Sequence, residues 1–508
     1  MFCRIKSGGI IGIEGFEVDV EVDVASGLPQ FHIVGLPDKA INEAKERVRS
    51  ALKNTGFQLP LKRITVNLSP SHLKKQGTHY DLPIALGLLK LSIGVEVRED
   101  TVVLGELSLD GKINAVKGVL PIVLSLKRAG YRRFVVPTDN EKEAGLVEGV
   151  EVYGFSSLKE VVDFFGGSLE KRPVSLSVRD ILWQVNSFSV DLSEVYGQHQ
   201  AKRALEIGVA GMHHLLLIGP PGAGKSMLAK RIVTIMPPMS FEEALEVTSI
   251  YSVAGLLDPK TPLITQRPFR SPLSNASDSA LVGGGTVPQP GEISLAHRGV
   301  LFLDEFPEFS RKAIEALRQP LEDGQVTVSR VGGRVTFPAQ FLLVVAMNPC
   351  FCGNYGNPYR ACVCTPLQLK QYQKRISAPI MDRIDLRVWV NPVEKEELLS
   401  MNSGETSESV RKRVLRAVEI QRERFKGSST KFNSRMSNEE VKRYCVMTQE
   451  AHNLLRSAVE KLDLTARGYM KVLKVARTVA DLEGEEKIAS HHMAEAIQLR
   501  IKEKAPTL

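Results

Sequence analysis

A glycine-rich octapeptide carries the clearest chemistry in the sequence, because its residue types suit the phosphates of a nucleoside triphosphate. Its members are Gly219, Pro220, Pro221, Gly222, Ala223, Gly224, Lys225 and Ser226. Glycines let backbone N–H groups turn toward phosphate oxygens, Lys225 can reach the β- and γ-phosphates, and Ser226 can offer its hydroxyl to Mg²⁺. A purely structural turn is the alternative. The octapeptide predicts ATP as the ligand and Mg²⁺ as its companion ion.

Two adjacent carboxylates, Asp304 and Glu305, follow an apolar run at residues 300–303. Asp304 would hold Mg²⁺ through its water molecules, and Glu305 would orient and polarise the attacking water. Another apolar run, residues 341–346, leads to Asn348, whose amide can hold that water against the γ-phosphate. An acidic pair after a strand is often only a solvated turn. Together with the upstream glycine-rich loop, it instead indicates hydrolysis of the triphosphate.

The segments around these groups have the patterns needed to position them. Residues 215–218 are an apolar run typical of a buried strand, and residues 227–232 are typical of a helix. Strand, glycine-rich loop and helix in this order are the context that a P-loop requires, and the helix N-terminus adds its partial positive charge. The three apolar runs therefore predict three buried strands of an α/β domain.

The size and composition of the chain limit its class. Its 508 residues exceed what one hydrophobic core usually holds, so about two to four domains are expected. There is no run of eighteen apolar residues and no signal-peptide pattern, and the six cysteines do not resemble a secreted disulfide framework. These features predict a cytoplasmic protein without membrane contact. The net charge of +8 suits a polyanionic partner, although a solvated basic surface gives the same total.

Residues 1–167 are predicted to form a compact α+β domain. Residues 16–24 alternate apolar and acidic side chains, which predicts a half-buried strand with an acidic outer face, and Asp38 is a predicted helix N-cap. The ribosomal-S5-like proteolytic domain of Lon proteases is similar to three stretches of this part, at residues 66–77, 105–112 and 129–142. That family needs a serine and a lysine at the positions held here by His79 and Leu120. We therefore expect a binding or scaffold domain without peptidase chemistry.

Residues 168–190 mix Ser, Pro and charged side chains, which predicts an interdomain linker. Residues 195–198 then resemble the segment of AAA+ ATPases that contacts the nucleotide base. Residues 267–272, 283–285 and 290–297 resemble magnesium-chelatase-like AAA+ ATPases, and more specifically the ComM (YifB) family. Leu273 and Ser274 depart from the histidine pair expected there. The resemblance covers nearly the whole chain and implies an α/β multidomain fold. The S5-like domain would be followed by an AAA+ P-loop domain at residues 191–392 and a helical lid at residues 393–508.

The AAA+ resemblance also implies roles for three polar residues. Asn348 corresponds to sensor 1, Arg383 to an arginine finger and Arg467 to sensor 2. Arg383 would reach the nucleotide of a neighbouring subunit, where its planar charge suits the phosphoryl transition state. A local ion pair with Asp382 or Asp385 is the alternative. An arginine that acts in trans implies a ring, and the expected ring is a homo-hexamer.

Residues 326–330 and 334–337 flank Gly332-Gly333, a pattern typical of a short β-hairpin. A two-residue turn would pair Val331 with Arg334 and Arg330 with Val335, so that both arginines lie near the tip. In related helicase rings such hairpins line the pore and grip the phosphate backbone, which makes Arg330 and Arg334 candidate DNA contacts. The alternative is a hairpin that packs against a neighbouring subunit.

Four cysteines form two CxC pairs separated by nine residues: Cys350, Cys352, Cys362 and Cys364. Four thiolates could close a tetrahedral Zn²⁺ site and pin a long loop near the nucleotide. Buried or redox-active free thiols are the alternative, because zinc sites usually have CxxC spacing. From Val410 onward the apolar spacing predicts a helical bundle, and its basic run is predicted to be a solvated face.

These features predict an ATP-driven hexameric motor that moves on single-stranded and branched DNA. By resemblance to the ComM family, the implied activity is helicase-type branch migration in natural transformation and homologous recombination, with recombination proteins as further partners. The alternative is a magnesium-chelatase-like chaperone that remodels a protein partner. The two hypotheses differ in whether DNA or a protein stimulates ATP hydrolysis.

Overall fold

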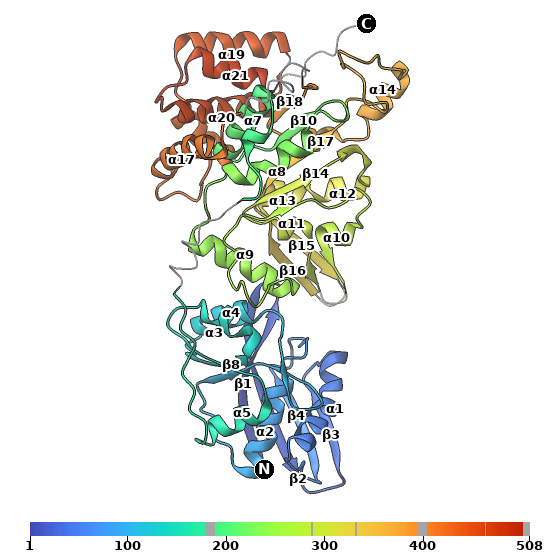
Figure 1. The fold of residues 1–508 in the computed structure, drawn as a ribbon, viewed down its shortest axis with the longest axis vertical. Coiled ribbons are helices and arrows are strands. Elements are labelled where there is room, and N and C mark those ends of the chain that lie inside the picture. Colours follow the sequence, from blue (N-terminus) through green and yellow to red (C-terminus); the bar gives the residue numbers. More distant parts are fainter. Residues whose placement is uncertain (178–187, 286–287, 331–332, 394–403, 463, 501–508) are drawn as a thin grey trace.

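The computed structural model describes residues 1–177, 188–285, 288–330, 333–393, 404–462 and 464–500. The molecule is elongated, with the N-terminal domain at one end and the C-terminal helices at the other (Figure 1). The middle of the predicted linker, residues 178–187, lies outside the described residues. Within the described ranges, no helix combines the length and the apolar character needed to cross a bilayer.

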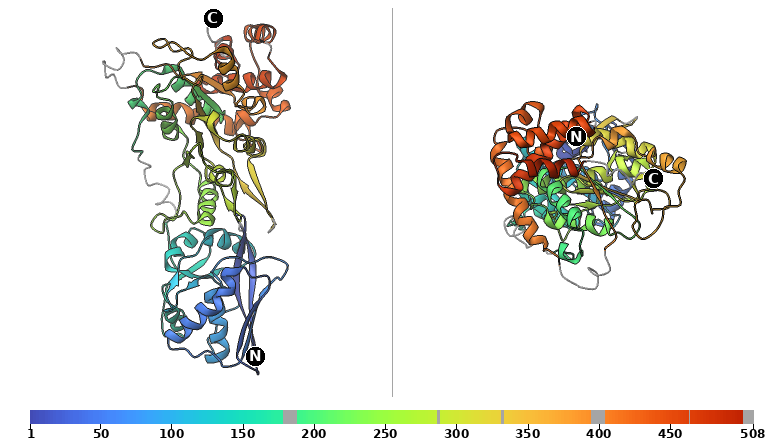
Figure 2. Two further views of the ribbon diagram at one scale, coloured as in Figure 1. Left: turned by 90° about the vertical axis from the view of Figure 1, so that its right-hand side faces the viewer. Right: turned by 90° about the horizontal axis from the view of Figure 1, so that it is seen from above.

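A seven-stranded mixed sheet organises the N-terminal domain, in the order β3-β4-β2-β1-β5-β8-β9. Its longest strands, β1 (Phe2–Ile11) and β2 (Glu14–Ala25), form an antiparallel pair along one side of the domain (Figure 2). The alternation predicted for residues 16–24 is confirmed, because the valines of β2 are buried while its acidic residues pair with Arg4 and Lys6. The other strands are β3 (Gln30–Val34), β4 (Arg63–Ser69), β5 (Thr101–Val103), β8 (Arg133–Pro137) and β9 (Glu151–Phe155).

Two apolar clusters hold the helices of this domain against the sheet. The first cluster includes α1 (Lys39–Asn54), α2 (Asp81–Ile93) and α5 (Leu158–Phe165), and the second includes α3 (Val119–Arg128) and α4 (Glu141–Gly145). Asp38 caps α1 as predicted, because its carboxylate accepts a 2.8 Å hydrogen bond from the Ile41 N–H. A separate short hairpin consists of β6 (Glu106–Leu107) and β7 (Ile113–Asn114).

A five-stranded parallel sheet forms the centre of the P-loop domain, in the order β11-β14-β17-β10-β18. Its strands are β10 (Leu215–Ile218), β11 (Phe269–Arg270), β14 (Val300–Leu303), β17 (Leu342–Met347) and β18 (Leu386–Trp389). The three apolar runs predicted as strands are β10, β14 and β17. Because all strands run in one direction, the segments that follow these three emerge at the same edge of the sheet.

Helices cover both faces of this sheet, which explains its continuous apolar strands. One face carries α7 (His199–Gly211) and α8 (Lys225–Ile235), and the other carries α14 (Pro366–Gln373) and α15 (Ala378–Met381). The remaining elements of the domain are α9 (Phe241–Ala254), α10 (Asp278–Val282), β12 (Gly283–Gly284), β13 (Gln289–Pro290), α11 (Glu292–Leu295), α12 (Arg311–Ala316), α13 (Arg318–Asp323), β15 (Gln325–Arg330) and β16 (Gly333–Pro338).

The C-terminal part is a helical bundle made of α17 (Ser407–Arg424), α18 (Asn438–Tyr444), α19 (Gln449–Leu462), α20 (Ala466–Glu483) and α21 (Ser490–Gln498). Its predicted apolar positions are buried: Val410, Val414, Val418, Val472, Val475 and Val479. They share one apolar cluster with α7, α8 and the adjoining face of the sheet, so the bundle packs directly on the P-loop domain. The chain is thus an α/β multidomain protein, as predicted.

The N-terminal domain packs against the P-loop domain through α3 and α9, which face each other in Figure 1. Val119 and Val123 of α3 share an apolar cluster with Ala244 and Val247 of α9. The Gly118 N–H donates a 3.2 Å hydrogen bond to the Ser252 carbonyl. At a second contact, the turn between β1 and β2 lies so close to β16 that a Cβ on Gly12 would be 2.9 Å from the Val335 side chain.

Candidate ATP site

The glycine-rich loop connects β10 to α8, which is the strand–loop–helix order predicted from the sequence. Gly222 and Gly224 have φ angles of 80° and 90°, a left-handed conformation that favours glycine. Gly219 passes so near β18 that a Cβ there would lie 2.2 Å from the Val390 carbonyl oxygen. The loop therefore has the backbone freedom and the close approach that a phosphate cradle needs.

Four of the predicted site residues converge beside this loop. Lys225 Nζ donates to the carbonyl oxygens of Gly219 at 2.7 Å and Pro220 at 2.9 Å, and to Asn348 Oδ1 at 3.2 Å. The Ser226 hydroxyl donates a short hydrogen bond to Asp304. Burial lowers the pKa of Lys225, and the nearby Asp304 and Glu305 carboxylates oppose that effect. The parallel sheet thus brings together groups from the ends of three strands.

Glu305 lies next to this cluster in an unusual backbone conformation. Its φ is 51°, in the left-handed region that non-glycine residues seldom adopt, and its side chain is exposed. The Glu305 N–H donates a 2.9 Å hydrogen bond to Asp304 Oδ1, which holds the Asp304 carboxylate against the backbone of Glu305. Strain of this kind, about 1–3 kcal/mol, is concentrated at active sites.

The donor set fits Mg²⁺ and a triphosphate. The Ser226 hydroxyl and the Asp304 carboxylate lie next to each other, and both offer the hard oxygen atoms that Mg²⁺ and its bound water molecules prefer. Lys225 and the N-terminus of α8 supply the positive charge for phosphate oxygens. Glu305 and Asn348 are placed to polarise and to hold a water molecule. This arrangement can hydrolyse a nucleoside triphosphate.

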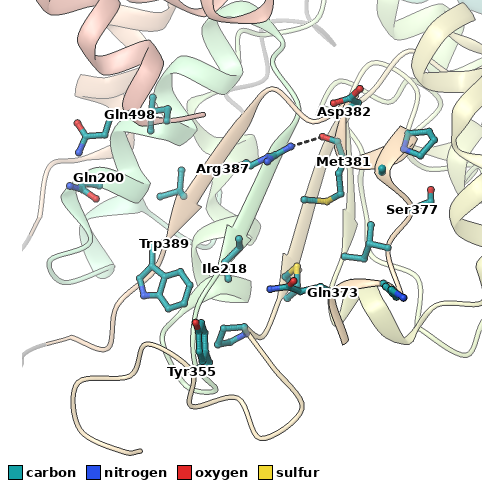
Figure 3. Close-up of a pocket in the computed structure, with 18 of the residues that line it drawn as sticks. Gln200, Ile218, Tyr355, Gln373, Ser377, Met381, Asp382, Arg387, Trp389 and Gln498 are labelled. Atoms are coloured by element: carbon teal, nitrogen blue, oxygen red, sulfur yellow. Dashed lines mark hydrogen bonds between the residues drawn. The ribbon is translucent and has the colours of Figure 1, made fainter. Parts of the chain in front are cut away.

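Arg383 and Arg467 lie away from this cluster. Arg383 follows α15 just before the start of β18, whereas the P-loop follows the end of β10, which is parallel to β18. Figure 3 shows this separation, with Asp382 at one end of β18 and Trp389 and Ile218 at the other. Arg467 is exposed in the first turn of α20, whose Lys471 contacts Asp385 at the same distal end. The fold therefore places both arginines at the edge opposite the chain's own P-loop.

The local partner of Arg383 differs from both residues considered in the sequence. Its guanidinium forms an ion pair with Glu322 of α13 and donates to the Pro379 carbonyl at 2.7 Å. The alternative of a pair with Asp382 or Asp385 is therefore wrong. Asp385 is instead occupied by Lys471, because the lid packs against the start of β18.

The four thiols predicted as a metal site lie together in the loop between β17 and α14, residues 348–365, which we call the thiol loop. Sγ–Sγ distances are 3.4 Å for Cys350–Cys352, 3.7 Å for Cys350–Cys362 and 3.6 Å for Cys352–Cys362, and Cys364 belongs to the same cluster. Four sulfurs bound at about 2.3 Å to one Zn²⁺ would be about 3.8 Å apart, so the cluster fits this ion. The loop also touches the P-loop, because a Cβ on Gly353 would lie 2.6 Å from Pro221 Cδ.

The hairpin of β15 and β16 is present, but its predicted register is wrong. Arg330 pairs with Gly333 and Ser329 with Arg334, in place of the predicted pairs Arg330–Val335 and Val331–Arg334. The register is set at the base of the hairpin, where Ala339 N–H donates a 2.8 Å hydrogen bond to the Gly324 carbonyl. Arg334 is exposed. Residues 331 and 332, which include half of the predicted turn, lie outside the described residues.

The two positions that correspond to the Lon catalytic pair are filled by groups without peptidase chemistry. His79 is buried, and its Nε2–H donates a 2.9 Å hydrogen bond to the Gly8 carbonyl. Burial lowers the pKa of His79 to about 4, so its ring is neutral at pH 7. Leu120 is also buried and offers no base. Neither a nucleophilic hydroxyl nor an amine is present at these positions.

One feature near the ATP site could not be read from the sequence. A cavity of about 1240 Å³ lies on the α14–α15 face of the sheet. Figure 3 shows Ile218 and Trp389 at the ends of their strands, Tyr355 from the thiol loop and Gln498 from α21 around it. Its walls come from segments that are distant in the chain, so no local pattern signals it.

Comparison with known proteins agrees with this geometry. The family profile described as "Magnesium chelatase, subunit ChlI" matches residues 191–398, "Subunit ChlI of Mg-chelatase" matches residues 20–140, and the C-terminal ChlI profile matches residues 404–500. The competence protein ComM of Haemophilus influenzae is 42% identical over 504 residues, covering 98% of this chain and 97% of that protein.

Two further relatives extend the comparison. The protein YifB of Salmonella typhimurium is 43% identical over 503 residues, covering 98% of this chain and 96% of its own length. A peroxisomal Lon protease homolog of Caenorhabditis briggsae is 28% identical over 170 residues, covering 32% of this chain and 22% of that protein. With near-complete coverage at this identity, the chain belongs to the ComM family of magnesium-chelatase-like AAA+ ATPases.

Proposed function

We propose that this protein is an ATP-driven motor that assembles as a hexameric ring and moves branched DNA during natural transformation and homologous recombination. The observation that carries the proposal is that the residues predicted for the ATP site lie at two opposite edges of one sheet. Lys225, Ser226, Asp304 and Asn348 meet at one edge, and Arg383 and Arg467 lie at the other. A neighbouring subunit would complete each site, as a closed ring allows.

The case for DNA rests on charge and on the hairpin. No Asp or Glu occurs between Gly324 and Met381, a stretch that contains β15, β16, the thiol loop and α14. Arg334 is exposed next to the hairpin tip, and Arg330 occupies the last paired position of β15. A hairpin with basic residues and no acidic ones suits the phosphate backbone of DNA. The similarity to a competence protein gives the proposed biological setting.

We further propose that Cys350, Cys352, Cys362 and Cys364 hold one structural Zn²⁺. Support comes from their sulfur–sulfur distances, which match those of a tetrahedral thiolate site. Such an ion would stiffen the loop that touches Pro221.

The test is ATP hydrolysis with and without single-stranded and branched DNA. We expect branched DNA to stimulate the wild type, Lys225→Ala to be inactive, and Arg334→Glu to keep basal turnover while losing most of the stimulation. Arg416→Glu is the matched control, because Arg416 is an exposed residue of the basic α17 that is predicted to be only a solvated face. It should behave as the wild type.

A different result would favour the alternative function. If DNA leaves the rate of ATP hydrolysis unchanged while Lys225→Ala still abolishes it, the protein is an ATPase but the proposal of a DNA motor is wrong. A protein-remodelling role of the magnesium-chelatase type would then be the better proposal. Stimulation of ATP hydrolysis by a protein partner would identify it.

A further inference from the structure

A buried ion pair joins the segment that carries Arg383 to the helical lid. Asp385 lies directly before β18, and its Oδ1 is 2.7 Å from Nζ of Lys471 in α20. The two side chains are only 10% and 19% exposed. Burying two charges carries a desolvation cost, so such a pair adds little to the free energy of unfolding. Its main effect is to hold the two segments in one geometry.

The second oxygen of Asp385 is hydrogen-bonded to the residue that precedes β10, the strand next to β18 in the sheet. Oδ2 accepts a 3.0 Å hydrogen bond from the N–H of His214, the residue directly before β10, and His213 Nδ1 lies 3.8 Å from the same oxygen. Nearby, the Arg500 guanidinium donates a 2.9 Å hydrogen bond to the Ile384 carbonyl. Asp385 thus connects the sheet, the Arg383 segment and the lid at one point.

Asp385 and Lys471 each lie close in sequence to one of the two arginines predicted to act on the nucleotide. Asp385 comes two residues after Arg383, and Lys471 comes one helical turn after Arg467. The 2.7 Å contact therefore joins the two segments that carry these arginines, beside the Arg500 hydrogen bond to Ile384. Both segments lie at the sheet edge opposite the chain's own P-loop.

We propose that Asp385 is a positioning residue for ATP hydrolysis. Through Lys471 it holds Arg383 and Arg467 as a preset pair, which one subunit presents to the nucleotide of its neighbour. This inference rests on the proposed function, since it requires a ring in which these arginines act in trans. Geometry matters because a misplacement of about 1 Å can lower a rate about 100-fold.

The first test uses rings of a single variant. Asp385→Asn leaves Lys471 buried without its counter-ion, so we expect kcat for ATP to fall about 10- to 100-fold. KM should stay close to wild type, because the variant's own P-loop edge is unchanged. Glu460→Gln, which removes an exposed ion pair with Arg456 in α19, is the matched control and should leave both constants unchanged. A rise of KM in proportion to the fall of kcat would overturn the proposal.

Mixed rings separate a positioning role from a folding defect. Asp385→Asn subunits keep an intact P-loop, and Lys225→Ala subunits keep both arginines and their spacing. In a random equal mixture, about a quarter of the interfaces have the P-loop of an Asp385→Asn subunit facing the arginines of a Lys225→Ala subunit. Both halves of such a site are intact. We expect the activity of the mixture to rise well above that of either variant alone, which an unfolded subunit could not produce.

A second mixture, of Arg383→Ala with Lys225→Ala, shows whether only the role of Asp385 is wrong or the arginine acting in trans is wrong as well. If that mixture regains activity and the Asp385→Asn mixture does not, the positioning role is wrong while the trans arginine stands. If neither mixture regains activity, hydrolysis does not use an arginine in trans. The proposed ring mechanism then fails, together with the role of Asp385.

Discussion

At the residue scale, Glu305 combines two properties that seldom occur together: an exposed carboxylate and a left-handed backbone. The conformation follows from its place, because β14 ends at Leu303 and the chain must turn sharply into the buried Phe306. In this turn the Glu305 N–H donates a 2.9 Å hydrogen bond to Asp304 Oδ1, and the Glu305 side chain stays exposed. A residue selected only for stability would avoid this strain.

We expect Glu305→Gln to bind ATP but to hydrolyse it about 10²- to 10⁴-fold more slowly, because an amide cannot polarise the attacking water. Phosphate release measures the rate, and titration with a fluorescent nucleotide measures the affinity. Glu439→Gln, at an exposed carboxylate in the first turn of α18, should change neither. Near-normal hydrolysis by Glu305→Gln would remove Glu305 from the mechanism.

His79 makes the stability of the protein depend on pH. Burial lowers its pKa from the usual 6.5 to about 4, so the unfolded chain binds a proton that the folded chain does not. The contribution of His79 to stability is complete above pH 6.5 and is lost as the pH falls toward 4. The expected slope from this one group is about 1.4 kcal/mol per pH unit.

His79→Gln should flatten this slope between pH 4 and 6.5, because glutamine can keep the hydrogen bond to Gly8 but does not titrate. Urea unfolding of the full chain at several pH values, followed by circular dichroism, measures the effect. The exposed His452 provides the control, since His452→Gln should leave the slope as it is. An unchanged slope in His79→Gln would show that other groups produce it.

At the element scale, the thiol loop contacts the P-loop directly and is linked through Arg375 to the segment after Glu305. Gly353 lies against Pro221, while Phe351 packs edge-on against Tyr372 and under the Arg375 guanidinium, 4.9 Å from its ring centre. Arg375 in turn forms an ion pair with Glu308. The loop therefore lies between Pro221 of the P-loop and the Arg375–Glu308 ion pair.

We expect Cys362→Ser to lose the bound metal, to melt at a lower temperature and to bind ATP more weakly, because three thiolates hold Zn²⁺ poorly. Elemental analysis of protein purified without oxygen gives the metal content per chain. Cys445→Ala, at a buried thiol of the lid outside the cluster, should keep the metal. Wild-type protein without stoichiometric metal would contradict the zinc proposal.

At the scale of the whole molecule, the N-terminal domain is fixed to the P-loop domain at two places. One is the α3–α9 contact, where Glu143 accepts hydrogen bonds from the Leu120 N–H at 2.9 Å and from the Ser252 hydroxyl. The other is the β1–β2 turn, whose Ile13 packs on the apolar cluster that includes Val328 of the hairpin. The hairpin proposed to touch DNA is thus in direct contact with the N-terminal domain.

Ile13→Asp should weaken this second contact by about 1–3 kcal/mol, because it places a carboxylate against an apolar cluster. In differential scanning calorimetry we expect an early transition of the N-terminal domain to separate from the main one. Ile11→Asp is the matched control on the same turn, since Ile11 is already 42% exposed. Identical scans for both variants would mean that the turn does not fasten the domain.

The sequence by itself determined the ATP site and the order of the domains. A P-loop needs a strand, eight consecutive residues and a helix. Asp304 and Asn348 each come at the end of an apolar run, and Glu305 is the residue after Asp304. These signals are local. Parallel pairing then brings the strand ends to one edge without further information.

Only the tertiary structure decided the contacts between distant segments. The hairpin register depends on Gly324 and Ala339 at its base, and Arg383 finds Glu322 because α13 packs beside α15. The Asp385–Lys471 pair exists because the lid folds against the start of β18. Such pairings depend on how whole elements pack against one another, and the residues next to each partner in the sequence do not specify that packing.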